Sequence, residues 1–448
     1  MGPFPRNIAT GVHKGMTGSG KLTRRDFFRK AAMGAASAVA APYVLTSNAL
    51  GAPGVQPASD RITLGILGAG GRAGNFYGYS PILAVCDVDR DRRQAAAKRI
   101  EGISGLAGIK DYNDFRDVLA RPDIDAVIIA APDHWHCQMS AMAALAGKDV
   151  YCEKPLTAYI KEGRRLSDLI AREGTVFQTG SQQRSDDLFR QACELVRNGY
   201  IGQIKKVTVG ILPGKSMPAP GAPDPIPDGF DYNLWLGPAP WAPYYKERCV
   251  YNFRFNLDYA AGKISDWGAH HLDIAQWGLG FERSGPIEVQ GSGTFPTDGI
   301  FNCAIDFTFE CKYPARPLFP NGLTLYCSDK YRLGIEWQGA EGAVFVTRGA
   351  IETTPSSLRM LKLKPDDIHL YDSKDHWYNF IDCVKTRRQT AAPVEIAHRT
   401  VTICHVANVA MLLGRPVKWD PATEQFPGDA QANSMPMVDR SRREPWSL

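Results

Sequence analysis

A short apolar segment followed at once by a glycine-rich turn constrains this chain more than any other feature. Residues 62–67, Ile-Thr-Leu-Gly-Ile-Leu, have the composition of a buried parallel strand. The next residues read Gly68-Ala69-Gly70-Gly71-Arg72-Ala73. This is the G-x-G-x-x-A spacing of a dinucleotide-binding turn, in which the first glycine permits the turn, the second admits the pyrophosphate and the alanine keeps strand and helix close. We expect a helix to follow, with its N-terminal N–H groups directed at the phosphates.

An acidic residue follows at the distance that a dinucleotide-binding unit requires. A second apolar segment, 82–86, predicts the next strand and is followed by Asp87, 19 residues after Gly68. In such units an acid about 20 residues beyond the first glycine bonds the adenosine ribose hydroxyls, and its charge repels a 2′-phosphate. The acid favours NAD over NADP. The spacing favours a dinucleotide site over the alternative, a glycine turn beside an unrelated acid.

Strands and helices continue to alternate up to about residue 182. Apolar segments predict strands at 125–130, 149–151 and 175–179, and helices are expected at 113–120, 135–146 and 160–173. This alternation predicts a parallel, doubly wound α/β sheet, a Rossmann domain over residues 60–182. Ligands of such sheets lie beyond the carboxyl ends of the strands. Those ends add four residues to the expected cofactor site: Pro132, His136, Glu153 and Lys154.

The second half of the chain has a different pattern. Strands are expected at 205–212, 287–293, 302–311, 323–327, 333–337 and 343–347, and helices at 375–386 and 396–413. This predicts a C-terminal α+β domain over residues 183–420 with a large, mostly antiparallel sheet. Residues 421–448 are polar and are expected to form an extended tail.

A long, Pro-rich connection runs from Pro213 to Val250. Because a loop of this length in a compact domain is usually functional, its aromatic residues have two readings. They form a sugar-binding rim, since rings stack on the apolar faces of sugars, or they pin the loop to its own domain. The residues concerned are Tyr232, Trp235, Trp241, Tyr244 and Tyr245.

The N-terminal residues 1–52 have the layout of an export signal. Thr23-Arg24-Arg25-Asp26-Phe27-Phe28-Arg29-Lys30 precedes an apolar, Ala-rich stretch, which is typical of a twin-arginine signal; an amphipathic helix with an unrelated arginine pair is the alternative. The pattern predicts passage of the folded protein through the Tat translocase to the periplasm. Cleavage is expected near Ala49 or Ala52, or the uncleaved segment anchors the protein in the membrane.

Charge and composition limit the classes of partner and the compartment that the chain suits. Residues 1–52 hold seven of the 52 basic residues and one of the 47 acidic ones, so the remainder carries 45 basic and 46 acidic residues. No basic excess is left to favour nucleic acid. No apolar run beyond the N-terminus is long enough for a transmembrane span. The ten cysteines show no CxxC pair. Cys86, Cys152 and Cys327 lie in apolar or strand-like contexts and are expected to be buried, with one or two disulfides open if the protein is exported.

Four motifs together resemble the glucose–fructose oxidoreductase / inositol dehydrogenase family, Gfo/Idh/MocA, over residues 60–420. They are the glycine turn, Ala131-Pro132-Asp133-His134-Trp135-His136, Glu153-Lys154-Pro155-Leu156, and Asp266-Trp267-Gly268-Ala269-His270-His271-Leu272-Asp273. The resemblance implies that Lys154 lies at the nicotinamide ribose and the substrate hydroxyl. It implies the same site for Asp266 and His270, which one helical turn would present on one face.

The residue types suit oxidation of a hydroxyl, with the carboxylate of Asp266 expected to bind the substrate. Histidine removes a hydroxyl proton at working pH because its ordinary pKa is about 6.5, and an ammonium stabilises a developing alkoxide. A solvated Lys154 and a structural His270 are the alternatives. Further candidates for binding the substrate are Arg184, Arg254, Tyr259 and His271, the last equally readable as a packed histidine. The histidines show no zinc-ligand spacing, and no metal is expected.

These expectations define an exported NAD(P)-dependent oxidoreductase acting on a sugar, polyol or glycoside hydroxyl. Free NAD is expected to be scarce outside the cytoplasm, so we expect a tightly bound cofactor that is recycled in the site. The alternatives are a redox-neutral NAD-dependent glycosidase or lyase and a nonenzymatic carbohydrate-binding protein. The family's C-terminal sheet has one open face, which implies a homodimer or homotetramer by analogy.

Overall fold

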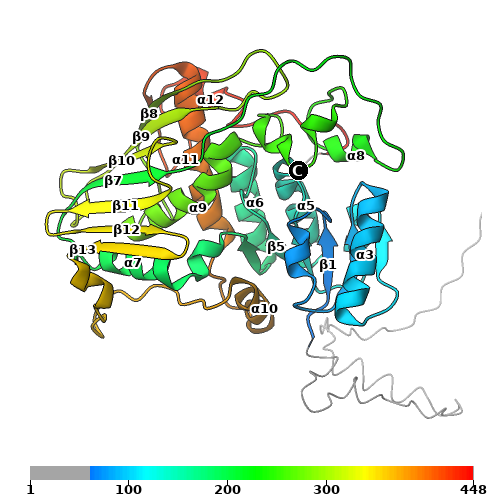
Figure 1. The fold of residues 1–448 in the computed structure, drawn as a ribbon, viewed down its shortest axis with the longest axis horizontal. Helices are drawn as coiled ribbons and strands as arrows, with labels where there is room; N and C mark the ends of the chain where they lie inside the picture. Colours follow the sequence, from blue (N-terminus) through cyan, green and yellow to red (C-terminus); the bar gives the residue numbers. More distant parts are fainter. Residues whose placement is uncertain (1–60, 447–448) are drawn as a thin grey trace, which may run out of the picture. The chain divides into compact units, whose positions relative to one another are not determined.

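Two β-sheets organise residues 61–446, the part of the chain that the computed structural model describes (Figure 1). The signal predicted for residues 1–52, with its cleavage sites, lies outside the described residues. The first sheet comprises six parallel strands in the order β3-β2-β1-β4-β5-β6, which is the dinucleotide-binding order. Its strands are β1 (Leu64–Leu67), β2 (Ile82–Cys86), β3 (Lys110–Tyr112), β4 (Ala126–Ile129), β5 (Asp149–Cys152) and β6 (Phe177–Thr179).

Helices cover this first sheet, as the alternation predicts. Every residue of β1, β4 and β5 is buried, which explains why these strands are continuously apolar rather than alternating. The helices are α3 (Arg90–Ser104), α4 (Phe115–Leu119), α5 (Asp133–Leu145) and α6 (Ile160–Glu173). The prediction of a parallel, doubly wound sheet is confirmed.

The prediction of a helix directly after the glycine turn is wrong. A single 3₁₀ turn, η2 (Ala73–Phe76), stands in its place. The reason lies in the eight residues from Gly74 to Pro81, which include Gly74, Gly78 and Pro81 and leave little length for a helix before β2. The glycine turn itself needs its first glycine, because Gly68 has φ +91° and a Cβ there would lie 2.7 Å from the Ala131 nitrogen. Backbone N–H groups of the turn, rather than a helix N-terminus, are therefore what this chain offers to phosphates.

The second sheet comprises eight strands in the order β13-β12-β11-β7-β10-β9-β8-β14. All neighbours are antiparallel except β7 and β10, so the expectation of a mostly antiparallel sheet is confirmed. Sequence patterns placed the start of β9 five residues too early and missed β13. The strands are β7 (Ile204–Gly210), β8 (Glu288–Gly293), β9 (Phe307–Tyr313), β10 (Leu323–Ser328), β11 (Gly334–Gly339), β12 (Ala343–Thr347), β13 (Ala350–Thr354) and β14 (Val417–Lys418).

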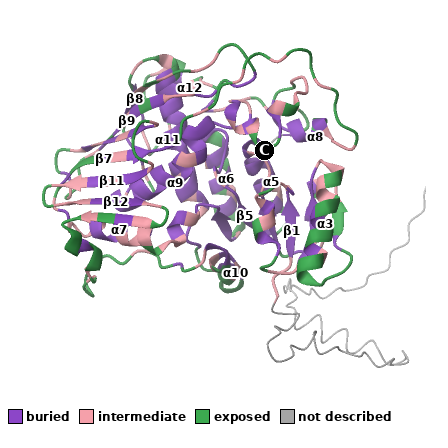
Figure 2. Ribbon diagram, in the orientation of Figure 1, coloured by how far each residue is buried: buried purple, intermediate pink, exposed green. Residues whose placement is uncertain are grey.

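Three helices pack on one face of the second sheet and form the largest apolar core (Figure 2). They are α7 (Asp187–Arg197), α9 (Gly262–Leu279) and α11 (Val394–Leu413). Among the described residues, α11 alone is long and apolar enough to cross a membrane, and most of it is buried in this core. The remaining short elements are η3 (Gln182–Ser185), α8 (Tyr232–Leu236), η4 (Lys246–Arg248), η5 (Asn252–Phe255), η6 (Ser356–Met360), α10 (His376–Thr386) and α12 (Ala430–Asn433).

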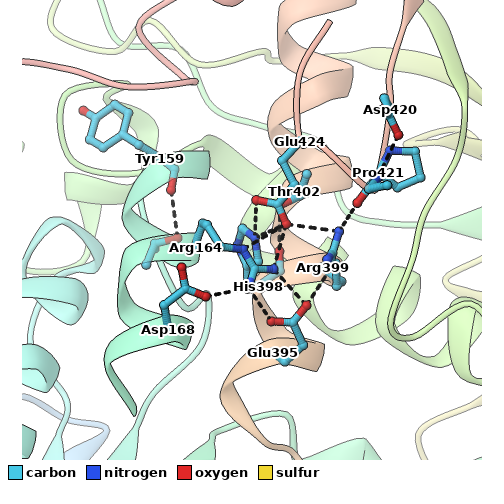
Figure 3. A network of polar contacts seen from close by, with 12 residues as sticks. Tyr159, Arg164, Asp168, Glu395, His398, Arg399, Thr402, Asp420, Pro421 and Glu424 are labelled. Carbon is cyan, nitrogen blue, oxygen red and sulfur yellow. Dashed lines mark hydrogen bonds and ion pairs between the residues drawn. The ribbon is translucent and has the colours of Figure 1, made fainter. Parts of the chain in front are cut away.

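A cluster of ion pairs joins the two halves of the fold (Figure 3). Arg164 of α6 binds Glu395 of α11 at 2.8 Å and Glu424, after β14, at 2.7 Å. Arg399 adds contacts to both acids, and the buried His398 lies 2.9 Å from Glu424. Because charge-assisted hydrogen bonds with several partners are directional, this cluster fixes the parallel-sheet helix α6 against the core helix α11.

The C-terminal residues differ from the extended tail that their polarity predicts. Lys161 and Ile160 donate backbone hydrogen bonds to Val438 and Met437, and the Trp446 ring packs 4.7 Å from the Trp135 ring of α5. The buried aromatic ring and the surrounding arginine hydrogen bonds outweigh the segment's polar composition. The segment is part of the folded unit and packs on the first sheet's helices.

Candidate active site

A cavity of about 690 Å³ lies beyond the carboxyl ends of the parallel strands, where ligands of doubly wound sheets bind. Residues of the first sheet's loops form one side, and α9, η5 and the β12–β13 hairpin contribute to the other. Contacts along the lining define an order: Asp87 binds the glycine turn, Arg72 of the turn binds Glu153, and the adjacent Lys154 binds Asp266. We call the two ends of this series the Asp87 end and the Lys154 end.

Backbone N–H groups hold the carboxylate of Asp87. Its oxygens accept hydrogen bonds from the nitrogens of Ala69 and Asp89, at 2.8 and 2.9 Å. Burial raises the pKa of Asp87, against the lowering effect of Arg92 3.9 Å away. Arg92 also contacts Asp89, so its charge is shared between two acids.

The glycine turn has the shape that a bound dinucleotide requires. Gly70 and Gly71 line the cavity, and a Cβ built on either would meet no atom within 4 Å. A ligand can therefore approach the backbone of the turn directly. Ala73 is fully buried beneath the turn and Ala69 binds Asp87, so these two alanines shape the turn from behind.

Arg72 and Glu153 form the middle of the cavity wall. Their side chains are 2.7 Å apart, and a Cβ on the neighbouring Gly180 would lie 2.8 Å from the Glu153 carboxylate. The glycine thus leaves room for the acid. The pair is internally neutral, which places the net charge of the cavity at its ends.

Lys154 and Asp266 meet although 112 residues separate them in sequence. The Lys154 Nζ donates to the Asp266 carboxylate at 2.7 Å and to the Asp266 backbone oxygen at 2.9 Å. An ammonium has three N–H donors, so one remains for a ligand. Since Lys154 lines the cavity, that donor can reach a substrate hydroxyl.

Three cations surround the carboxylate of Asp266. Besides Lys154, Lys263 lies 2.7 Å and Arg254 3.8 Å from its oxygens. Burial acts to raise the pKa of Asp266, but Lys154, Arg254 and Lys263 together hold it well below its ordinary value. Its two oxygens accept hydrogen bonds from Lys154 and Lys263, so Asp266 holds the Lys154 ammonium in place and is not free to bind the substrate as expected.

His270 lies on α9 four residues after Asp266 and lines the same end of the cavity. Burial lowers its pKa well below 6.5, and the nearby Lys154 adds to this effect. Among the described residues its Nδ1 has no hydrogen-bond partner. A neutral imidazole beside an ammonium can accept a proton from a hydroxyl.

Asp133, the first residue of α5, follows a strand end in the sequence but was given no role in the predicted site. It is buried, lines the cavity, and has Arg254, Asp266 and Lys154 as its charged neighbours. Burial raises its pKa to about 7. Its place directly beyond the end of β4 was the available signal, because ligands lie at such strand ends.

The structure brings only some of the predicted residues to the cavity. Pro132 and His136 line it, but both His136 ring nitrogens contact backbone oxygens, of Pro155 at 2.6 Å and Ala131 at 2.9 Å. His136 therefore anchors the Glu153-Lys154-Pro155 turn to the end of β4.

Of the four candidates for substrate binding, Arg254 alone lines the cavity. Arg184 is buried in a two-bond pair with Asp273, and His271 contacts the Gly210 oxygen at 2.8 Å from a fully buried position. Tyr259 is fully buried beside Trp235. These three side chains are therefore packed inside the fold and do not reach the cavity. Of the connection's aromatic residues, Tyr232 and Trp235 pin the loop in a buried cluster, and Trp235 also lines the cavity, whereas Trp241 is 71% exposed.

Two family models match the chain. One, described as an oxidoreductase family with an NAD-binding Rossmann fold, matches residues 62–181. The other, described as the C-terminal alpha/beta domain of the oxidoreductase family, matches residues 190–301 and 337–448. The chain belongs to the Gfo/Idh/MocA oxidoreductase family. As a member of this family it is an NAD(P)-dependent oxidoreductase with an NAD-binding Rossmann domain.

Relatives within the Gfo/Idh/MocA family differ in how much of the chain they match. The uncharacterized oxidoreductase YrbE of Bacillus subtilis is 25% identical over 80% of this chain and 96% of its own length. Inositol 2-dehydrogenase of Salmonella typhimurium is 32% identical over 30% of this chain and 38% of its own length. Among solved structures, the WlbA dehydrogenase of Bordetella pertussis, in complex with NADH and UDP-GlcNAcA, covers 80% of this chain and 98% of its own, with a TM-score of 0.57 and 16% identity. That structural likeness establishes the fold.

Proposed function

We propose that this enzyme oxidises a hydroxyl of a sugar, polyol or glycoside by hydride transfer to NAD. The observation that carries the proposal is the meeting of Lys154, Asp266 and His270 at one end of a cavity whose other end is a dinucleotide turn. Inositol dehydrogenases among the relatives support a polyhydroxylated substrate.

The residues divide the work at the reacting hydroxyl. The free N–H of Lys154 binds the hydroxyl oxygen and stabilises negative charge on it. The neutral His270 takes the hydroxyl proton, while the hydrogen on the same carbon leaves with its electron pair. The nicotinamide, when bound, accepts that hydride. Asp266 fixes the ammonium through two hydrogen bonds on α9.

NAD is proposed over NADP, because the buried Asp87 acts against a second phosphate. Retention of the cofactor is supported by residues 228–237 of the Pro-rich connection, here named the clasp. Asp231 accepts a hydrogen bond from Asn113 and donates its N–H to the Val88 oxygen, and Asp228 pairs with Arg90. Two of these partners, Val88 and Asn113, line the cavity beside Asp87, so the clasp packs against the Asp87 end and this packing is what supports retention.

The C-terminal residues secure the clasp from behind. Arg443 donates to the backbone oxygens of Gly237 and Asn233, and the indole nitrogen of Trp135 donates to the Trp235 oxygen at 3.0 Å. Opening the clasp therefore requires these contacts to break as well. This arrangement supports slow exchange of the dinucleotide.

We also propose that the enzyme is exported folded and loaded by the twin-arginine route, with the carbohydrate as its small-molecule partner outside. All ten cysteines are free and buried, so folding requires no oxidising compartment. Export of a loaded enzyme suits a cofactor held by the clasp. The test is cell fractionation, with Arg24→Lys/Arg25→Lys as the control that blocks a twin-arginine signal.

A retained cofactor favours a second candidate, a redox-neutral glycosidase or lyase. In that cycle a hydroxyl is oxidised, a bond is eliminated and the product is reduced at the same site. Asp133 supports it, because a carboxyl that titrates near neutrality beside Lys154 can donate a proton to a leaving group.

The first experiment measures NAD(H) released on denaturation of protein purified without added cofactor. About one equivalent of NAD(H) per chain supports retention of the cofactor by the clasp. A protein without NAD(H) contradicts that retention. Sugars, polyols and chromogenic glycosides are then added in single turnover, and reduced nicotinamide is followed by absorbance. Accumulation of NADH indicates a net dehydrogenase, glycoside cleavage without NADH indicates the redox-neutral cycle, and no response to any of the panel counts against both.

A further inference from the structure

Positive charge exceeds negative charge at the Lys154 end of the cavity. Lys154, Lys263, Arg254 and Arg348 all interact with the carboxylate of Asp266. That carboxylate already accepts Lys154 on one oxygen and Lys263 on the other. Arg254 and Arg348 are thus the two cations of this group that form no hydrogen bond with an acid.

Arg254 is held in place without being neutralised. Its guanidinium lies 4.1 Å from the centre of the Tyr251 ring and 4.8 Å from that of Phe253, and its Nη1 donates to the Tyr251 oxygen. Its Nε is 3.8 Å from Asp266, which is beyond hydrogen-bond distance. Stacking on two rings fixes the orientation of the fork and leaves donors for a ligand.

Arg348 reaches the cavity from the turn between β12 and β13, on the second sheet. Its guanidinium lies 5.0 Å from the centre of the Trp267 ring, on the helix that carries Asp266 and His270. Within residues 61–446 it forms neither a hydrogen bond nor an ion pair with an acid. Partial burial of this guanidinium lowers its pKa, because removal from water disfavours the charged form. An anionic ligand would offset that cost.

Two further acids act on these arginines and compensate for only part of their charge. Asp186 acts on Arg348 without forming an ion pair with it. Asp133 interacts with Arg254, and with a pKa of about 7 it is only partly ionised at neutral pH. A concave site with unpaired guanidinium groups attracts and orients oxyanions, because their forks match carboxylate and phosphate geometry.

We propose that the substrate carries an oxyanion group, a carboxylate or a phosphate, and that Arg254 and Arg348 bind it while the reacting hydroxyl lies at Lys154 and His270. The substrate class is then an acidic sugar, either a uronic acid or a sugar phosphate. This inference rests on the proposed hydroxyl oxidation for its placement of the substrate.

The cofactor's pyrophosphate is the competing anion. The glycine turn already offers it backbone N–H groups, and Arg254 contacts Asp266, the acid that binds Lys154. Arg348 interacts with Arg72 of the turn as well as with Asp266, so its variant is the one that separates the two anions most directly. The two explanations predict different losses. If the arginines served the pyrophosphate, their removal would weaken NAD binding and leave the preference among sugars unchanged.

Binding to the NAD-loaded enzyme tests the inference separately from turnover. Calorimetric titrations use a hexuronate, a hexose 6-phosphate and the matching neutral hexose. We expect one acidic sugar to bind about 10- to 100-fold more tightly than the neutral one, with an affinity that falls as salt rises. The acid that binds more tightly identifies the group as carboxylate or phosphate.

Arg254→Met and Arg348→Met should each remove most of this preference, and Arg254→Lys, which keeps the charge and loses the fork, should retain part of it. Arg359→Met removes an exposed arginine and is the matched control. Equal or tighter binding of the neutral sugar by the wild type overturns the proposal, even if that sugar is oxidised. So does an arginine variant that weakens NAD instead. Acidic-sugar binding without oxidation would leave this inference standing and contradict the proposed function.

Discussion

The two ends of the cavity each hold a buried carboxylate, and the pKa values of the two carboxylates are shifted in opposite directions. Asp87 is 8% exposed and Asp266 is 7% exposed, yet the pKa of Asp87 is raised and that of Asp266 is lowered. Both experience the same desolvation, which favours the neutral form. Asp266 differs because three cations surround it, whereas Asp87 has two backbone N–H groups and one shared arginine.

This contrast separates two uses of an acid in one site. The Asp87 end offers oxygens to uncharged ligand groups, as ribose hydroxyls are, and needs little other charge. The Lys154 end uses its acid to arrange cations around a reacting hydroxyl. Substitutions at the two ends should therefore change different measurements.

The largest effect is expected from Lys154→Met. It removes the donor to the hydroxyl, so kcat/KM should fall about 10³-fold, while NAD binding, measured by fluorescence titration, should change by less than about 3-fold. Lys98→Met removes an exposed lysine on α3 and serves as the control. Loss of NAD binding on the scale of the activity loss would show that the two ends do not act separately.

His270→Ala should lower kcat by about 10²- to 10³-fold. Because burial lowers the pKa of His270 well below 6.5, the base is already unprotonated at neutral pH. Wild-type oxidation should therefore stay level as pH falls to 6.5 and decline only in more acidic buffer, measured as initial rates across pH. A decline centred above 6.5 would assign the limiting proton to another group, and Asp133 would be the first to test.

Asp87→Asn should act on the other end of the cavity. Removing the negative charge should shift the NAD-to-NADP preference by about 10- to 100-fold, through tighter NADP and weaker NAD binding. The ratio of the two dissociation constants measures this, and kcat with saturating cofactor should change little. An unchanged ratio would mean that Asp87 does not approach the adenosine ribose.

Glu424→Gln gives the smallest effect and tests the same physics outside the cavity. Although burial opposes it, contacts with His398, Arg164 and Arg399 lower the pKa of Glu424 to about 2. Its folded pKa is thus below the ordinary value, so its contribution to stability is present above about pH 4.5 and is lost as pH falls toward 2. We expect a loss of about 2 kcal/mol at neutral pH, seen as a lower Tm, with unchanged kcat.

Comparison of wild type and Glu424→Gln at low pH completes that test. The difference in Tm between them should shrink as pH falls from 4.5, because the wild type also loses the charge. A difference that is independent of pH would show that packing, not ionisation, holds Glu424 in the network of Figure 3.

The sequence by itself determined the first sheet and most of the Asp87 end. The glycine turn, the acid 19 residues later and the continuously apolar strands are local features, because one βαβ unit supplies the whole adenosine site. The period of the strands and helices likewise fixed the change of architecture near residue 200. Its errors include the helix after Gly71 and the unrecognised β3 and β13, all segments too short for periodicity to decide. The 15-residue helix α3 was also not predicted.

Only the tertiary structure decided the composition of the Lys154 end. Family motifs supplied Lys154, Asp266 and His270, but the 2.7 Å contact across 112 residues, and the cations around it, follow from how α9 packs against the end of β5. Asp133 and Arg348 enter the cavity, and Arg184, His271 and Tyr259 leave it, for the same reason. Whether a polar side chain binds a ligand or a neighbour depends on its surroundings in space, and residues distant in sequence provide them.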